Sequence, residues 1–295
     1  MSQSSGLKYA YFPGCSLQSS AVDYNRSILS TCTELGIELR ELEDWNCCGT
    51  TAVTSTNLLL SYLLPARNLA LAEEEGLDLA VACNSCLVTH RRVTGCFSLD
   101  ISPLANKIRS SLHKIGRTFR GRVQVRHILD ILAEDLGFEG LAGKVKRRLE
   151  GLKVVPYYGC QYSRPGAQLK EAEMPESMDQ ILDLLGVEVK EYSRKTKCCG
   201  GVLMTTKPEI AAALVNELLE EAADRGADAI VVTCPLCQMN LDIYQGDVNA
   251  RFGRSYNLPV VYFTQLLGIA LGVKLVELDV HRGFVPAEPL LRKYA

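Results

Sequence analysis

The sequence lacks the features that would place a protein on nucleic acid, in a membrane or outside the cell. Its formal net charge is −2, so no strong field of either sign attracts a polyanion or an anionic lipid surface. No apolar run reaches the ~18 residues that a membrane span needs, and residues 58–64 come nearest. The first six residues contain no apolar signal core. We therefore expect a cytoplasmic protein without a membrane span and without nucleic acid as a partner.

A common cofactor-binding signature is also missing, and histidines are few. The Gly-x-Gly-x-x-Gly pattern of dinucleotide-binding folds does not occur, so the chain offers no nicotinamide or flavin motif of its own. The sequence has four histidines, and only His90 lies near a motif, one helical turn after Cys86. His90 is a candidate for facing the bound group or a substrate, and we expect the other three, His113, His127 and His281, to be structural.

Cysteine is what the sequence has in abundance. Ten of the twelve cysteines form two sets of five with one spacing pattern, a lone cysteine, an adjacent pair and a Cys-x-x-Cys. Thirty-five positions separate Cys48 from Cys83, and the same number separate Cys199 from Cys234. The first set is Cys15, Cys47, Cys48, Cys83 and Cys86, and the second is Cys160, Cys198, Cys199, Cys234 and Cys237. Cys32 and Cys96 have no counterpart in the other half, and we expect them to be ordinary core or surface residues.

Five cysteines exceed what the common metal sites require. A structural zinc ion takes four ligands, and an ordinary 4Fe–4S cubane also takes four cysteines. Either one cysteine is spare in each set, or the bound group needs all five. Gly49, Gly200 and Gly201 follow the adjacent cysteines and let the backbone approach a bulky group closely. We interpret each set as one metal-cluster site. Zinc at one site and a thioredoxin-like dithiol are the alternatives.

The expected secondary structure repeats in the same order around both sets. In the first half it is strand 7–12, helix 23–35, strand 37–42, helix 58–75 and strand 79–82. In the second half it is strand 153–158, helix 177–185, strand 187–192, helix 208–224 and strand 229–232. Each half closes with a strand that runs into an apolar helix, near His127 and near Tyr262. Alternation of this kind predicts an α/β fold of two pseudo-repeated, Rossmann-like parallel sheets, with the cysteines at the carboxyl ends of the strands.

The repeat sets the expected domain boundaries. We expect an N-terminal cysteine-rich domain at residues 1–140, a basic helical linker at 141–151 and a C-terminal cysteine-rich domain at 152–273. The register between the halves drops from 151 residues at the adjacent cysteines to 135 near His127 and Tyr262, so the first half carries about sixteen extra residues around positions 100–122. Residues 274–295 are expected to form an extended C-terminal tail, which is either a frayed terminus or a strap onto a partner.

The doubled pattern Cys…Cys-Cys-Gly…Cys-x-x-Cys resembles the cysteine-rich CCG domain, and nearly the whole chain resembles the B subunit of heterodisulfide reductase. The motifs that carry the resemblance are Tyr157-Tyr158-Gly159-Cys160, Pro175-Glu176-Ser177, Cys198-Cys199-Gly200-Gly201, Cys234-Pro235-Leu236-Cys237 and Gln265-Leu266-Leu267-Gly268. The resemblance implies that each set of five cysteines holds a noncubane 4Fe–4S cluster. It also implies that a disulfide such as CoM-S-S-CoB is split between the two clusters. The implied partners are a flavin-containing A subunit and a ferredoxin-like iron–sulfur C subunit.

One segment departs from the methanogen forms of this family. Those forms have a proline-rich stretch after the first pair of cysteines, where this chain has Gly49-Thr50-Thr51-Ala52. The chain therefore resembles the versions found in other prokaryotes, and its disulfide or related sulfur substrate can differ. An electron-transfer module that relays electrons to a partner enzyme and a zinc-binding scaffold are the competing functions. His90, Arg91, Lys195 and Lys197 are the candidate contacts for an anionic substrate, with Arg92 and Arg164 also near the motifs.

The cysteine pattern predicts the metal content of the protein. Protein purified without oxygen should carry about eight irons and eight acid-labile sulfides per chain, since two four-iron clusters are expected. Chemical analysis of iron, sulfide and zinc on the same sample makes the measurement. Stoichiometric zinc with little iron would support the scaffold instead.

Overall fold

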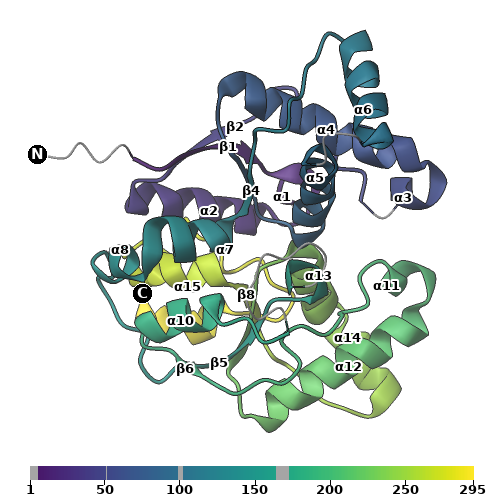
Figure 1. Ribbon diagram of the computed structural model, residues 1–295. Helices are drawn as coiled ribbons and strands as arrows, with labels where there is room; N and C mark the ends of the chain where they lie inside the picture. The colour runs from purple at the N-terminus through teal and green to yellow at the C-terminus, as the bar shows by residue number, and fades with distance from the viewer. Residues whose placement is uncertain (1–5, 51, 99–101, 164–172) are drawn as a thin grey trace, which may run out of the picture.

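The computed structural model of the protein describes residues 6–50, 52–98, 102–163 and 173–295. It has two α/β halves (Figure 1). The N-terminal half, purple to blue, lies above the C-terminal half, green to yellow, and helices of both halves meet between the two sheets. Within the described residues, no helix combines the length and the apolar character needed to cross a membrane.

The two sheets have one topology. All strand pairs are parallel, and the strand orders are β2-β1-β3-β4 and β6-β5-β7-β8, so the second sheet repeats the first. This confirms the expected pair of parallel-sheet units. The strands are β1 (Lys8–Phe12), β2 (Glu38–Glu41), β3 (Leu79–Val81), β4 (Val125–His127), β5 (Lys153–Tyr157), β6 (Glu188–Val189), β7 (Ala229–Val232) and β8 (Val260–Tyr262).

Helices connect the strands in both halves. Those of the N-terminal half are α1 (Gly14–Leu17), α2 (Val22–Leu35), α3 (Ala52–Thr56), α4 (Leu58–Glu75), α5 (Asn84–Phe97), α6 (Pro103–Lys114), α7 (Ile128–Asp130), the π-helix η1 (Ile131–Gly137) and α8 (Phe138–Ala142). Those of the C-terminal half are α9 (Cys160–Ser163), α10 (Ser177–Leu184), α11 (Leu203–Thr206), α12 (Pro208–Asp224), α13 (Pro235–Ile243), α14 (Gln245–Phe252), α15 (Phe263–Ala270), α16 (Glu288–Leu291) and the 3-10 turn η2 (Arg292–Tyr294).

Helix α4 continues through Pro65 because the carbonyl that the proline leaves unpaired finds another donor. Proline has no N–H, so the carbonyl of Ser61, four residues earlier, loses its partner within the helix. The guanidinium of Arg92, from α5, donates to that carbonyl at 3.0 Å and to the Ser61 hydroxyl at 3.1 Å. Helix α4 therefore runs unbroken to Gly76, which ends it in the left-handed conformation with φ 68°.

The halves pack through a pair of helices, one from each half. Helix α2 of the N-terminal half lies against α15 of the C-terminal half. The rings of Tyr24 and Tyr262 stack with centroids 3.9 Å apart, and the hydroxyls of Ser27 and Thr264 are 2.7 Å apart. All four side chains are buried. The contact joins the halves through fully packed aromatic and hydrogen-bonded groups.

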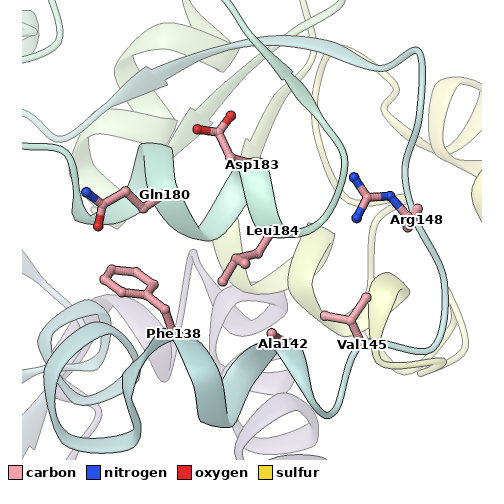
Figure 2. Close-up of a pocket in the computed structure, with 7 residues that line it drawn as sticks. All are labelled: Phe138, Ala142, Val145, Arg148, Gln180, Asp183 and Leu184. Carbon is pink, nitrogen blue, oxygen red and sulfur yellow. The ribbon is translucent and has the colours of Figure 1, made fainter.

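The linker differs from its prediction. The expected helix over residues 141–150 is wrong, because α8 ends at Ala142 and the chain then continues without a helix. The N–H groups of Lys146 and Arg147 both donate to the carbonyl of Ala270, at 2.8 and 3.0 Å, instead of to their own helix. Between this linker and α10 lies a hollow of about 580 Å³, with Leu184 on one wall and Phe138, Ala142 and Val145 on the other (Figure 2).

Residues 274–295 also differ from their prediction as an extended tail. Leu278 and Leu291 are fully buried, and Asp279 pairs with Arg26 of the N-terminal half at 2.8 Å. The side-chain amide of Gln265 donates to the carbonyl of Leu278 at 3.1 Å. The carboxylate of Asp242, on α13, accepts the backbone N–H groups of Phe284 at 2.7 Å and Val285 at 3.0 Å. Contact of this segment with a partner protein stays a prediction.

Asp242 provides a test of how this segment is fixed. Replacing Asp242 with Ala should lower the free energy of unfolding by about 1–3 kcal/mol, because two backbone N–H groups lose their acceptor. Urea unfolding of the full chain makes the measurement. Glu277→Ala, an exposed change in the same C-terminal segment, is the matched control and should alter stability by less than about 0.5 kcal/mol. Equal stability of Asp242→Ala and wild type would contradict the assignment.

Candidate functional site

The carboxyl ends of the central strands deliver the cysteines. In the N-terminal half β1 leads to Cys15, and β3 leads to Cys83, the residue that caps α5. In the C-terminal half β5 leads to Cys160, and β7 leads to Cys234, the corresponding cap of α13. The first turn of each of these two helices therefore lies within its Cys-x-x-Cys. A helix N-terminus favours a thiolate and an anionic group bound to it.

The first set of cysteines runs from the core to the surface. The sulfurs of Cys48 and Cys86 are 3.3 Å apart, and both residues are buried. Cys83, which caps the helix that carries Cys86, is buried as well. Cys15 and Cys47 are exposed, with sulfurs 4.0 Å apart. The site therefore has a buried floor and an open rim.

The second set has the same form. The sulfurs of Cys199 and Cys237 are 3.6 Å apart at its buried end, and Cys198 is exposed at the other. All five cysteines of the set line one cavity of about 190 Å³, together with Gly200 and Gly201. The structure therefore brings the five cysteines of this set together around one cavity, and their binding of a cluster stays a prediction.

Glycines keep both sites open to a bulky group. A methyl group added at Gly159 would lie 3.0 Å from the sulfur of Cys237, and one added at Gly14 would lie 3.4 Å from that of Cys86. Both glycines have positive φ, 76° and 71°. The five sulfurs lie around a space that a single added Cβ would narrow. This arrangement fits a polynuclear iron–sulfur group. Within the described part of the chain, no three His, Cys, Asp or Glu side chains are arranged to hold a single metal ion.

The two sites meet at Cys83 and Cys234. The Cys234 thiol, from the other half, is the largest influence that raises the pKa of Cys83, so the two side chains lie close together across the boundary between the halves. The thiols of Cys237 and then of Cys83 lower the pKa of Cys234. The two sets of cysteines therefore adjoin across the boundary between the halves, and their sharing of one substrate stays a prediction.

Asn84 joins the two halves where the cysteine sites adjoin, and the sequence analysis did not single it out. Its side-chain amide donates to the carbonyl of Tyr158 at 2.7 Å, although Asn84 belongs to the first Cys-x-x-Cys and Tyr158 to the second half. Thr233 completes the contact by donating to the same carbonyl at 3.2 Å. Asn84 also lines the cavity of the second set. The sequence signal that could have found Asn84 is its position inside a Cys-x-x-Cys, because a side-chain amide has no role there as a metal ligand.

Hydrogen bonding within each set divides the thiols by acidity. Bonds from Cys47 and then Cys86 lower the pKa of Cys48 to about 3. The bond to Cys48 is in turn the largest cause that raises the pKa of Cys86, and Cys199 raises that of Cys237 in the same way. A metal ligand must be a thiolate, so Cys48 and Cys234 are the sulfurs already biased toward that form.

Asn240 is a second residue that the sequence analysis missed. Its side-chain amide donates to the carbonyls of Cys199 and Gly201, both at 2.9 Å, and lies 3.8 Å from the sulfur of Cys199. It is fully buried on α13, three residues after Cys237. A buried amide on an apolar helix face was the available signal. Asn240 fixes the loop that presents the adjacent cysteines.

The four candidate substrate contacts lie in different surroundings. His90 is fully buried, with Nδ1 2.7 Å from the carbonyl of Cys86, and burial lowers its pKa to about 4. Arg91 pairs with Asp130 at 2.8 Å, and Lys195 is buried against Asp179 at 2.8 Å. Lys197 is exposed. Substrate contact by any of the four stays a prediction, and Arg164 lies outside the described residues.

The two cysteines outside the sets have ordinary surroundings, one in the core and one partly exposed. Cys32 is buried on α2, and burial raises its pKa to about 12. Cys96 is partly buried on α5. Neither belongs to the cavity of the second set.

Comparison with known proteins gives the same division of the chain. The model of the cysteine-rich domain known as CCG matches residues 9–90 and again 154–242. The chain belongs to the family of cysteine-rich CCG-domain proteins. Each match begins at the first strand of a half and ends after its Cys-x-x-Cys, so each contains one complete set of five cysteines.

Relatives of this family member are subunits of reductases. It is 34% identical to an 8-methylmenaquinol:fumarate reductase membrane anchor subunit of Wolinella succinogenes, over 96% of this chain and 99% of that one. It is 31% identical to an Archaeoglobus profundus protein named as similar to the B subunit of heterodisulfide reductase, over 90% and 91%. It is 30% identical to the B subunit of a ferredoxin/F420H2-dependent CoB-CoM heterodisulfide reductase of Methanosarcina acetivorans, over 97% and 96%.

A solved structure shares the fold. A hypothetical protein from Helicobacter pylori superposes with a TM-score of 0.78 at 13% sequence identity. The superposition covers 94% of this chain and 52% of the other, so this chain spans about half the length of that protein. The likeness concerns the arrangement of the two α/β halves.

The cradle at Gly159 generates a test of the second site. Gly159→Ala should remove about four irons per chain and leave the first cluster in place, because the new methyl group reaches the Cys237 sulfur. Iron analysis of anaerobically purified protein measures the loss. Gly253→Ala is the matched control, since Gly253 also has positive φ, 63°, but no atom within 4 Å of an added Cβ. Unchanged iron content in Gly159→Ala would contradict the assignment.

Proposed function

We propose that the protein is the catalytic subunit of a heterodisulfide reductase-like complex. It would hold two iron–sulfur clusters, one in each set of five cysteines, and reduce or form a disulfide or a related sulfur compound between them. The observation that carries the proposal is that the two cysteine sites adjoin: Asn84, which lies between Cys83 and Cys86, lines the cavity of the second set and donates to the carbonyl of Tyr158 at 2.7 Å. The relatives from Archaeoglobus and Methanosarcina, which bear heterodisulfide reductase names, support it.

Reduction of a disulfide requires two electrons to reach the same S–S bond. Reducing a disulfide breaks one S–S bond, consumes two electrons and two protons, and releases two thiols. Two clusters would supply those electrons one each. What this chain contributes is position: the thiolates hold the clusters, Asn84 and Thr233 fix the two halves against one another, and the glycines leave the approach open. Positioning of this kind lowers a barrier without an acid–base pair.

The electrons must enter through other proteins. The chain has no flavin or nicotinamide motif, and the names of the relatives place them in multisubunit reductases, one of them dependent on ferredoxin. We propose a ferredoxin-like iron–sulfur C subunit and a flavin-containing A subunit as partners. The substrate is a small disulfide, of which CoM-S-S-CoB is the example set by the Methanosarcina relative.

One observation favours a second function. The Wolinella relative, at 34% identity over nearly its whole length, bears the name of a subunit of a fumarate reductase. In a complex of that kind the two sites would relay electrons to a partner that carries out the reduction. The two functions differ in whether a substrate must reach both sites at once.

Single-site variants separate the two functions. Cys48→Ala and Cys199→Ala should each abolish disulfide reduction with reduced methyl viologen as the electron donor, because both electrons have to arrive at one substrate. Each variant should retain the spectrum of the cluster in its unaltered half, which serves as the internal control. If a variant that lost one cluster kept near-normal turnover, the paired mechanism would have to be dropped. Wild-type protein that reduces no disulfide yet passes electrons to a partner reductase would establish the relay.

A further inference from the structure

The first turn of α5 reaches the cysteine site of the other half. Helix α5 begins at Asn84, inside the first Cys-x-x-Cys, yet Asn84 and Ser85 line the cavity that the five cysteines of the second set surround. Both residues are buried. The N–H of Leu87 donates to the carbonyl of Cys83 at 2.9 Å. The N–H groups of the three residues before Leu87 therefore have no partner within the helix.

The packing of the two halves on each other is reciprocal. Helix α5 lies against α9, which begins at Cys160, and helix α13 lies against α1, which carries Cys15. The packing of α2 on α15 has a counterpart in that of α10 on α7. The pseudo-repeat therefore places the start of α13 beside the first cysteine site, as it places the start of α5 beside the second.

One difference in sequence breaks this symmetry. The first residue of α5 is Asn84, and the first residue of α13 is Pro235. Asparagine has a backbone N–H at this position, whereas proline has none. The start of α5 therefore offers the second site a donor that the start of α13 does not offer the first. The side chain of Asn84 holds the start of α5 in place, because it donates to the carbonyl of Tyr158 at 2.7 Å.

The cysteines that cap the two helices differ accordingly. The thiols of Cys237 and Cys83 are the largest influences that lower the pKa of Cys234, and the backbone N–H groups of Cys237 and Asn84 lower it further. The pKa of Cys83 is raised, chiefly by the Cys234 thiol, and the backbone N–H that opposes this rise is that of Cys86, in the same half. A backbone donor from the opposite half thus acts on the sulfur of Cys234.

We propose that the backbone N–H of Asn84 makes the two sites unequal as electron acceptors. It raises the reduction potential of the iron–sulfur group in the second set, and the lack of an N–H at Pro235 leaves the first set without the same effect. Reduction adds negative charge to an iron–sulfur group, and an N–H directed at its sulfurs stabilises that charge. The inference rests on the proposed function, since it needs a one-electron group in each set. It adds that the N–H of Asn84 favours occupation of the second site by an arriving electron.

Redox titration of the anaerobically purified full chain tests the proposal, with dithionite and mediator dyes as the reductant and electron paramagnetic resonance as the readout. Asn84→Pro removes the N–H, and Asn84→Ala is its matched control, because both variants lose the side chain and only one loses the N–H. The residue before a proline must be extended, and Cys83 already is, with φ −102° and ψ 125°. Relative to Asn84→Ala, Asn84→Pro should make reduction of one group about tenfold less favourable, a shift of about 59 mV for one electron. That group should be the one that Cys48→Ala protein retains.

Pro235→Ala is the reciprocal variant, because it gives the start of α13 an N–H. It should raise the potential of the other group by a similar amount. Equal potentials in Asn84→Pro and Asn84→Ala, shifts of the same group by Asn84→Pro and Pro235→Ala, or no rise in Pro235→Ala would overturn the proposal.

Iron analysis of the same samples separates this inference from the proposed function. Protein that carries both iron–sulfur groups but shows none of these shifts would contradict the inference alone. Wild-type protein without iron in the two sets would contradict the proposed function and the inference with it.

Discussion

The structure depends on one contact, where the carboxyl ends of β3 and β7 meet across the boundary between the halves. Cys83 and Cys234 lie close together there, and the carbonyl of Tyr158 is bound by both Asn84 and Thr233. Burial makes these polar contacts mandatory, because an unpaired amide or carbonyl at this place would cost about 1–3 kcal/mol. The relative position of the two cysteine sites is therefore fixed by the fold itself.

The halves repeat one another in topology and differ in what surrounds the repeat. In both halves the helix after the last strand begins with a side-chain oxygen that accepts the backbone N–H of the capping residue, Asp130 for His127 and Gln265 for Tyr262. Asp130 and Gln265 make different further contacts in the two halves. Asp130 binds Arg91 and the hydroxyl of Tyr162, whereas Gln265 binds the carbonyl of Leu278 in the C-terminal segment. The two sites are therefore similar, whereas the elements that surround them differ between the halves.

Local signals in the sequence predicted most of the fold. The helix at residues 208–224 and the strand at 229–232 coincide with α12 and β7, because a proline at the first turn and a continuous apolar run are strong local signals. The linker and residues 274–295 were predicted wrongly. Their structure is set by distant acceptors, the carbonyl of Ala270 and the carboxylate of Asp242, which no local pattern reveals. The two sets of cysteines were predicted from spacing, whereas their contact through Asn84 needed the arrangement of both halves.

The central claim is that two iron–sulfur groups lie side by side, one in each half, on either side of Cys83 and Cys234. X-ray diffraction at the iron absorption edge, from crystals of protein purified without oxygen, tests it most directly. The account predicts two separate anomalous peaks, each enclosed by one set of five cysteines and both adjacent to the contact of β3 and β7. A single peak, peaks at the zinc edge, or iron bound away from these cysteines would contradict it.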